Sequence, residues 1–313
     1  MSPVTTILET PLLPGLVLRN PVMSASGTYG AGLEGSQFGD VTGLGALVTK
    51  TVTPKARVGN PPPRIHETSG GMLNSIGLEN PGVEKFLAED LPRALELGPP
   101  VFLNVAGESM EEFASVVERV QGCGAAALEV NLSCPNVQGG ALPFATDARA
   151  CEDLIKRLAA ISDLPLFVKL TPNVTRITEI AQAAEAGGAK GLTLINTLLG
   201  LAVDWRRRVS RIGLGAAGYS GPSIKPVALR CVYQVRQVTQ LPILGVGGAS
   251  SAEDVLEFLV AGANAVQVGT ASFRDPLAAL HILRDLEVLL TEDGSTVREV
   301  TGTLRLPNEH HAR

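Results

Sequence analysis

The fold of this chain is best predicted from residues 125–136, Ala-Ala-Ala-Leu-Glu-Val-Asn-Leu-Ser-Cys-Pro-Asn. The apolar run Ala125–Val130 is typical of a buried strand, and the proline that follows ends it. Cys134 therefore comes at the end of a core strand, between the carboxamides of Asn131 and Asn136, which can each donate and accept hydrogen bonds. Most free cysteines are small buried apolar residues, but catalysis in barrels takes place at this end of the strands. Cys134 is therefore a candidate catalytic residue.

Seven further β-rich runs occur along the chain, and helical patterns lie between most of them. The eight runs together are Pro21–Ala25, Ala46–Val52, Val101–Val105, Ala125–Val130, Leu166–Leu170, Gly191–Ile195, Ile243–Val246 and Ala265–Val268. The helical patterns are Met110–Val120, Asp147–Ile161, Ile177–Ala186, Ile224–Val238 and Ala252–Ala261. Strands that alternate with helices indicate a parallel sheet, and eight strands are the number in a closed (β/α)8 barrel. We therefore predict an α/β fold of the TIM-barrel class, with residues 1–313 as one domain.

Three segments fall outside the barrel pattern. Val4–Leu18 contains a Pro-Gly turn and predicts a short N-terminal hairpin. Thr53–Asn80 and Leu199–Gly221 are too long for simple connections, and we expect insertions that cover the carboxyl-terminal face of the strands. Within the second insertion, Arg206–Arg208 is best interpreted as a solvated turn.

Composition and charge exclude several classes of protein. Hydrophobic residues make up 45% of the 313 and charged residues 18%, which predicts a well-buried core. The net charge of −5 offers no basic surface to nucleic acid or to an anionic membrane. No apolar stretch approaches the ~20 residues that span a bilayer, and Met1–Thr10 lacks a signal-peptide pattern. We therefore expect a cytoplasmic protein.

The four cysteines, at positions 123, 134, 151 and 231, do not follow a metal-binding pattern. Their spacing matches neither zinc nor iron–sulfur motifs. Four thiols in a chain of this length do not indicate a disulfide-bonded scaffold either. The four histidines offer no metal spacing, so we predict no bound metal.

Two glycine clusters follow the last two predicted strands. Gly245-Val246-Gly247-Gly248 leads into a helix capped by Ser250-Ser251, and Gly269-Thr270 follows the eighth strand. Barrels commonly bind phosphate with these two loops, because backbone N–H groups there point at the anion. Gly213–Gly218 matches the dinucleotide pattern G-x-G-x-x-G, but it follows no strand and no acidic residue lies about 20 positions on. We predict a phosphate site and no Rossmann domain.

Two lysines and several asparagines lie at or beyond the predicted strand ends. Lys50 and Lys169 each end a strand, and a lysine that points into a barrel mouth is costly to bury unless it meets an anion. The asparagines are Asn74, Asn104, Asn131, Asn136, Asn173 and Asn196. Their amides suit a substrate with alternating C=O and N–H groups, such as a pyrimidine ring.

Longer motifs show which family the chain resembles. They are Asn20–Gly27, Lys50–Thr53, Gly59–Arg64, Gly71–Gly82, Asn131–Asn136, Val168–Asn173, Ser220–Arg230 and Gly245–Ser250. Over nearly the whole chain, these motifs resemble the soluble class 1 dihydroorotate dehydrogenases, and within them the NAD-linked 1B catalytic subunits. One departure is Ala217, where the family has the first glycine of Gly-Gly-bulky-Ser-Gly. An alanine fits there only if its φ is negative.

The resemblance implies oxidation of (S)-dihydroorotate to orotate in pyrimidine (UMP) biosynthesis, with FMN lying across the barrel mouth. Cys134 would take the proton from C5 of the substrate, while a hydride passes from C6 to N5 of FMN. The residues implied to hold FMN are Ser26, Lys50, Thr51, Asn104, Asn131, Lys169, Ile195, Gly221, Gly247, Gly248, Gly269 and Thr270. The residues implied to bind dihydroorotate or orotate are Lys50, Asn74, Ser75, Ile76, Gly77, Leu78, Asn131, Asn136, Asn196 and Thr197.

The resemblance also implies partner subunits. The chain has neither a dinucleotide fold nor an iron–sulfur cysteine cluster, so a second subunit carrying FAD and a [2Fe–2S] cluster would pass the electrons to NAD. The implied assembly is a heterotetramer, in which a dimer of this chain carries one such subunit on each copy. The alternative is a class 1A enzyme, in which fumarate enters the FMN site and no partner is needed.

Three other classes of protein are alternatives. A tRNA dihydrouridine synthase shares the barrel, FMN and the strand-end cysteine, but it needs a basic face, which the net charge of −5 disfavours. A dihydropyrimidine dehydrogenase domain is closer in chemistry, but its motif carries His at the position of Asn136. A catalytically silent barrel that serves as an interaction scaffold would not need Cys134, Lys50 and Lys169 together.

Overall fold

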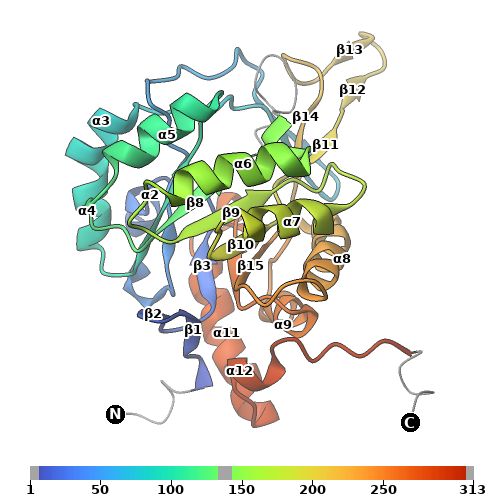
Figure 1. The fold of residues 1–313 in the computed structure, drawn as a ribbon. Coiled ribbons are helices and arrows are strands. Elements are labelled where there is room, and N and C mark those ends of the chain that lie inside the picture. Colours follow the sequence, from blue (N-terminus) through green and yellow to red (C-terminus); the bar gives the residue numbers. More distant parts are fainter. Residues whose placement is uncertain (1–6, 133–142, 308–313) are drawn as a thin grey trace.

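Eight parallel strands form a closed sheet at the centre of the protein (Figure 1). The structure is a computed structural model and describes residues 7–132 and 143–307. The strands are β3 (Val22–Ser24), β4 (Leu47–Val48), β7 (Val101–Val105), β8 (Ala127–Asn131), β9 (Leu166–Leu170), β10 (Gly191–Leu194), β15 (Ile243–Val246) and β16 (Ala265–Val268). Their order is β3-β16-β15-β10-β9-β8-β7-β4, and a parallel bridge between Met23 and Ala46 joins the two ends. Each strand overlaps one predicted run, which confirms the predicted (β/α)8 barrel.

Helices cover the outside of this barrel. Those that follow five of its strands are α5 (Met110–Arg119), α6 (Ala148–Ala159), α7 (Ile177–Ala186), α8 (Lys225–Arg236) and α9 (Ala252–Ala261), and all lie within the predicted ranges. Local sequence explains where they begin. The side chain of Ser109 accepts a hydrogen bond from the N–H of Glu112 and so caps α5. Ser251 and Asp254 form a reciprocal capping box at the start of α9.

Several helices were not predicted from the sequence patterns. The longest is α11 (Ala278–Asp293), whose buried residues Ala279, Ile282, Leu286 and Leu290 recur every three or four positions. It packs against β3 and α9. The shorter ones are α2 (Leu33–Ser36), η1 (Val41–Gly43), α3 (Val83–Lys85), η2 (Phe86–Asp90), α4 (Leu91–Glu96), η3 (Pro143–Ala145), η4 (Pro222–Ile224), α10 (Ala271–Arg274) and α12 (Val297–Val300). Within residues 7–132 and 143–307, no helix is long and apolar enough to cross a membrane.

An N-terminal hairpin packs against the amino-terminal end of the barrel. It consists of β1 (Thr10–Leu13) and β2 (Leu16–Leu18), so the predicted hairpin is confirmed over the part of the chain that is described. Its buried side chains pack with side chains from the amino-terminal half of individual barrel strands. We call this apolar group the floor; it comprises Leu12, Leu18, Met23, Phe102, Phe167 and Leu244. The rings of Phe102 and Phe167 meet edge to face, with their centroids 5.2 Å apart.

The two long insertions come together in a second sheet, which we call the roof. Its strands are β5 (Ile65–Thr68), β6 (Gly71–Asn74), β11 (Leu198–Gly200) and β14 (Ala217–Ser220), in the antiparallel order β11-β14-β6-β5. Residues of this sheet and of the carboxyl ends of the barrel strands line one cavity, so the expected cover over that face is confirmed. Ala217 is buried inside β14 and is not among the residues with positive φ, which explains why alanine is accepted there.

The second insertion also contains a hairpin that projects from the barrel, formed by β12 (Val203–Asp204) and β13 (Val209–Ser210) (Figure 1). Arg206–Arg208 forms its exposed turn, where the N–H groups of Arg206 and Arg207 both donate to Asp204 Oδ1 at 3.1 Å. The solvated turn is therefore confirmed. The G-x-G-x-x-G match at 213–218 runs from this hairpin into β14 rather than from a strand into a helix, as the sequence context indicated.

Candidate active site

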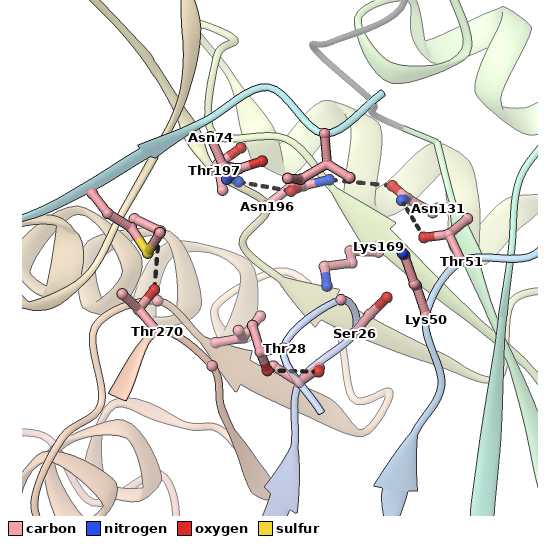
Figure 2. A pocket seen from close by; sticks show the side chains of 18 of the residues that line it. Ser26, Thr28, Lys50, Thr51, Asn74, Asn131, Lys169, Asn196, Thr197 and Thr270 are labelled. Atoms are coloured by element: carbon pink, nitrogen blue, oxygen red, sulfur yellow. Dashed lines mark hydrogen bonds between the residues drawn. The ribbon is translucent and has the colours of Figure 1, made fainter. Parts of the chain in front are cut away.

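A cavity of about 330 Å³ lies between the carboxyl ends of the barrel strands and the roof (Figure 2). Seven of the eight strands contribute to its lining, at Ala25–Thr28, Lys50–Thr51, Asn131, Lys169, Ile195–Thr197, Val246–Gly248 and Gly269–Thr270. The roof and its loops add Ile65, Met72, Asn74, Ile76–Glu79 and Ser220. A cavity of this size and position is typical of the ligand site of a barrel protein.

Glycine-rich loops form one side of this cavity. Gly248 has a φ of +89°, and a Cβ there would lie 2.8 Å from the carbonyl oxygen of Gly221. Gly221 has a φ of +105°, and a Cβ there would lie 2.7 Å from Cα of Gly71. Only glycine fits these positions, because other residues rarely adopt this φ and the added atom would clash with backbone. The loops at Gly247–Gly248 and Gly269–Thr270 thus bring bare backbone to the cavity, with Gly221 packed behind Gly248.

The same loops can bind an anion. Among the residues that the structure describes, the backbone N–H groups of Gly248 and Thr270 donate to no protein acceptor. The loop after Gly248 leads into α9, whose N-terminus is favourable for negative charge. A phosphate group is bound well by free N–H donors next to a helix N-terminus. It also needs backbone that no side chain covers, which the glycines provide. The residues therefore fit the phosphate of FMN.

The ion pair between Asp254 and Lys225 holds the loop between Gly248 and α9 in place. Asp254 accepts hydrogen bonds from the N–H groups of Ser250 and Ser251, at 2.7 and 3.0 Å, and pairs with the ammonium group of Lys225. Burial alone would raise the pKa of the Asp254 carboxyl, but hydrogen bonds from Lys225 and Ser250 outweigh burial and hold the pKa below its usual value. Asp254 is therefore ionised at neutral pH and fixes the loop.

Amide side chains from three segments meet on the opposite side of the cavity. Asn196 Nδ2 donates to Asn131 Oδ1 at 3.2 Å, and Asn131 Nδ2 lies 3.5 Å from Thr51 Oγ1 (Figure 2). The Asn196 oxygen accepts from the N–H of Thr197 at 2.8 Å, which fixes the orientation of this amide. Asn74 approaches from the roof, where its Nδ2 lies 3.4 Å from the carbonyl oxygen of Gly218. The group offers donors and acceptors to a polar ring.

Two lysines bring positive charge to these amides. Lys169 extends from β9 into the cavity (Figure 2), and its Nζ lies 3.3 Å from Glu129 Oε1. Lys50 follows β4, and within the described ranges it forms no ion pair with a carboxylate. The cavity therefore combines a cation free to meet a ligand with several amides, an arrangement that suits a planar anion.

Most residues proposed from the sequence come together here. Those that line the cavity are Ser26, Lys50, Thr51, Asn74, Ile76, Gly77, Leu78, Asn131, Lys169, Ile195, Asn196, Thr197, Gly247, Gly248, Gly269 and Thr270. Asn104 and Ser75 are buried outside the lining, where Asn104 donates to Glu129 at 2.6 Å and Ser75 Oγ accepts from Asn60 at 2.9 Å. Gly221 lies behind Gly248. Cys134 and Asn136 lie outside the described residues.

Glu129 is a buried charged residue beside the cavity that the sequence motifs do not predict. This carboxylate lies in the middle of β8, inside the apolar run Ala125–Val130, and its side chain is 0% exposed. A glutamate inside an apolar strand is itself a signal, because such a residue is almost never fully buried unless it is paired. Gln267, inside the apolar run Ala265–Val268, carries a similar signal. Met72, Ile65 and Phe273 also line the cavity without having been proposed.

The three cysteines that the structure describes do not line the cavity. Burial raises the pKa of the Cys151 thiol to about 12. Burial also raises the pKa of Cys123 and of Cys231 above the ordinary value. None of these thiols supplies a thiolate near neutral pH. Within the described residues, no group of three or more His, Cys, Asp or Glu side chains is arranged to hold a metal ion.

The fold and the cavity define an α/β-barrel protein whose mouth has glycine loops that fit a phosphate group and amides and lysines that suit a planar anion. Comparison with known proteins identifies the family. The family model described as dihydroorotate dehydrogenase matches residues 8–290. The chain belongs to the dihydroorotate dehydrogenase family.

Curated relatives cover nearly the whole chain. One from Geobacillus sp. (strain WCH70) is 49% identical over 283 residues, which are 90% of each chain. Another from Listeria welshimeri is 47% identical over 290 residues, 92% of this chain and 95% of the relative. A third, from Anoxybacillus flavithermus, is 48% identical over 292 residues, 93% of this chain and 94% of the relative. All three are named dihydroorotate dehydrogenase B (NAD(+)), catalytic subunit.

Proposed function

We propose that this chain catalyses the FMN-dependent oxidation of (S)-dihydroorotate to orotate, a step of pyrimidine biosynthesis. The observation that carries the proposal is one cavity that combines Lys50 and Lys169 with the amides of Asn74, Asn131 and Asn196, next to the glycine loops. Orotate carries a carboxylate and a ring with alternating C=O and N–H groups, which these cations and amides match. Membership in the dihydroorotate dehydrogenase family supports the same reaction.

The glycine loops would hold the phosphate of FMN, through the backbone of Gly247, Gly248, Gly269 and Thr270, with Gly221 behind them. Residues proposed for the ring and the ribityl chain are Ser26, Lys50, Thr51, Asn131, Lys169 and Ile195. Asn104 lies behind the lining, where it donates to Glu129, and would act on the cofactor only through that carboxylate. When bound, FMN supplies the acceptor for the hydride that leaves C6 of dihydroorotate. The positive charge of Lys169 favours the negative charge that accompanies this transfer. The substrate would be oriented by Lys50, Asn131, Asn136, Asn196, Thr197 and the loop 74–78.

Cys134 is proposed as the general base that takes the proton from C5. The other three cysteines support this assignment, because they lie away from the cavity and burial raises the pKa of each thiol. An ordinary thiol with a pKa of about 8.5 is mostly protonated at neutral pH, so the reaction should quicken as the pH rises toward that value. Loss of the C5 proton to the thiolate and of the C6 hydride to FMN converts dihydroorotate to orotate.

The first experiment follows the visible spectrum of the purified chain before and after anaerobic addition of dihydroorotate. We expect a yellow protein that releases FMN on denaturation and that bleaches when substrate is added. Cys134→Ser should keep FMN and orotate binding and slow bleaching by roughly 10²-fold or more, the usual size of a general-base contribution. Cys151→Ser is the matched control and should bleach at the wild-type rate. A colourless protein, or equal rates for Cys134→Ser and wild type, would reject the assignment.

The electrons must leave the chain for a further acceptor. The relatives are named as NAD(+)-linked catalytic subunits, and on this ground we propose a partner subunit that carries FAD and a [2Fe–2S] cluster. The proposed assembly is a heterotetramer with a homodimer of this chain at its centre. We also propose that residues 1–313 form one FMN-binding domain, and a cytoplasmic location stays a prediction.

The isolated chain separates the two possible acceptors. Under the proposal it should oxidise dihydroorotate with an artificial dye, but reduce neither NAD nor, at a comparable rate, fumarate. Adding the partner subunit should restore NAD reduction. Rapid fumarate-dependent turnover by the chain alone would instead indicate the class 1A reaction and leave the partner without a role.

A further inference from the structure

Glu129 is the centre of a buried hydrogen-bond network inside the barrel, directly next to the cavity. Its Oε1 accepts from Asn104 Nδ2 at 2.6 Å and lies 3.3 Å from Lys169 Nζ. Its Oε2 accepts from Thr193 Oγ1 at 3.0 Å and from Gln267 Nε2 at 2.6 Å. Four donors from β7, β9, β10 and β16 therefore converge on one carboxylate of β8. The network crosses the interior of the barrel, because β8 and β16 are four positions apart in the sheet.

The orientation of the two amides indicates that the network is organised around a negative charge. Asn104 and Gln267 both turn their NH2 groups toward Glu129, and their carbonyl oxygens are buried without a hydrogen-bond partner among the described residues. Buried polar atoms without a partner are uncommon. Charge-assisted hydrogen bonds are about twice as strong as neutral ones, and this accounts for the orientation. The carboxylate of Glu129 therefore determines how both amides point.

Lys169 links this network to the cavity. Its side chain is 7% exposed and lines the cavity, while its ammonium group contacts Glu129. Buried charges interact strongly because little water screens them. The field in the cavity therefore depends on both charges, and the carboxylate offsets part of the positive charge of the lysine.

We propose that Glu129 is a positioning residue that fixes the ammonium group of Lys169 and sets the reduction potential of the bound cofactor. The inference rests on the proposed FMN-dependent function. Two-electron reduction of FMN with uptake of one proton adds one negative charge. Lys169 favours that charge and Glu129 opposes it, so Glu129 keeps the potential lower than Lys169 alone would set it.

The test measures the reduction potential of bound FMN, with dithionite as reductant and a dye of known potential as reference. Glu129→Gln keeps the side-chain shape and removes the charge. Asn104 and Gln267 face different oxygens of Glu129, so the amide that faces the new NH2 group can rotate and offer its oxygen, while the other still donates to the remaining oxygen. We expect the preference for reduced over oxidised FMN to rise by at least about tenfold, or about 30 mV for a two-electron couple. Lys169→Gln should shift the preference in the opposite direction.

Two further variants separate charge from structure. Thr193→Val removes one hydrogen bond to Glu129 and keeps both charges. Its preference for reduced over oxidised FMN should therefore stay within about threefold of that of the wild type, which corresponds to about 15 mV. The double variant Glu129→Gln/Lys169→Gln loses both charges together and should also stay within about threefold of wild type. This double variant keeps the test decisive if Glu129→Gln alone does not fold.

Each outcome bears on one claim. If Glu129→Gln weakens FMN binding or lowers stability without moving the potential, Glu129 is only structural and the inference is overturned. A double variant with the same low potential as Lys169→Gln would overturn it as well, because Lys169 would then act without compensation. A wild-type chain that binds no FMN would overturn the proposed function and this inference with it. The potential is measured without dihydroorotate. If the variants bind FMN but do not shift its potential, only this inference fails, and the proposed reaction is unaffected.

Discussion

The two ends of the barrel interior are built by the same strands and differ in almost every side chain. The floor is apolar, whereas the cavity at the other end is lined by lysines, amides and glycines. On β7 the floor residue Phe102 is two positions from Asn104, and on β9 Phe167 is two positions from Lys169. Successive inward-facing residues on a strand lie only about 7 Å apart. The change from apolar to charged surroundings therefore takes place within one pleat of the sheet.

This difference shows how the barrel can carry a costly site. A buried ion pair and buried amides contribute little net stability, because removing them from water costs about as much as their interactions regain. Burial of apolar surface in the floor contributes stability without any need for partners. The hairpin β1–β2 contributes Leu12 and Leu18 to the floor and so enlarges it, while the roof leaves a cavity at the other end. Stability and binding should therefore respond to different residues.

The largest expected effect is on the floor. Phe102→Ala removes a fully buried ring that packs on Phe167, and should lower the free energy of unfolding by about 3–5 kcal/mol. Binding of FMN should stay close to wild type, since Phe102 does not line the cavity. Urea denaturation and FMN titration measure the two quantities, with Phe102→Leu as a milder control. Equal losses of stability and FMN affinity would show that floor and cavity are not separable.

A substitution in the cavity should weaken ligand binding more than it lowers the free energy of unfolding. Asn196→Ala leaves polar groups of orotate unpaired, and orotate binding should weaken by about 1–3 kcal/mol. Asn264 is the matched control, because its Oδ1 accepts from the N–H of Ile243 at the amino-terminal end of β15. Asn264→Ala should lower stability and leave orotate affinity unchanged. Isothermal titration of orotate into both variants tests the contrast, which fails if both bind with the same dissociation constant.

A third variant tests whether the glycines of the cavity loops are needed for FMN binding or only for the backbone conformation of the loops. Gly248→Ala forces alanine into a left-handed conformation, at about 1–2 kcal/mol, and places a Cβ 2.8 Å from Gly221 oxygen. FMN should bind at least about tenfold more weakly, a loss of about 1.4 kcal/mol. Gly98→Ala has a similar φ of +96° with no atom within 4 Å of its Cβ, so it should cost stability alone. Unchanged FMN affinity in Gly248→Ala would remove the loop from the binding site.

The smallest expected effect is a pH dependence at Asp254. Because its pKa is lowered by folding, its contribution to stability is complete above the unfolded value of about 3.9 and is lost as the pH falls through the folded pKa. Asp254→Asn should be less stable than wild type at pH 7, and the difference should narrow below about pH 4. Urea midpoints across this range measure it. Glu299→Gln, in the exposed capping box of α12, should show a smaller difference.

The sequence patterns were most informative where one local rule decides the structure. The eight strands and five of the helices follow from apolar periodicity and caps such as Ser109 and Ser251. The sequence predicted a cover over the strand ends but not the roof sheet itself, because β6 and β14 pair residues more than 140 positions apart, such as Asn74 with Gly218. Helix α11 has a clear apolar periodicity, but no side chain caps its start. The roles proposed for Cys134 and Asn136 stay predictions.

By itself the sequence determined the class of fold and most of the residues that line the cavity, because parallel strands bring their carboxyl ends, and the residues that follow them, to one side of a sheet. Only the tertiary structure decided which buried polar groups meet inside the barrel. Glu129 and Gln267 belong to strands four positions apart, and nothing local in either strand specifies that they lie 2.6 Å apart. Closure of the barrel decides this contact, since it directs the inward-facing side chains of opposite strands at one another.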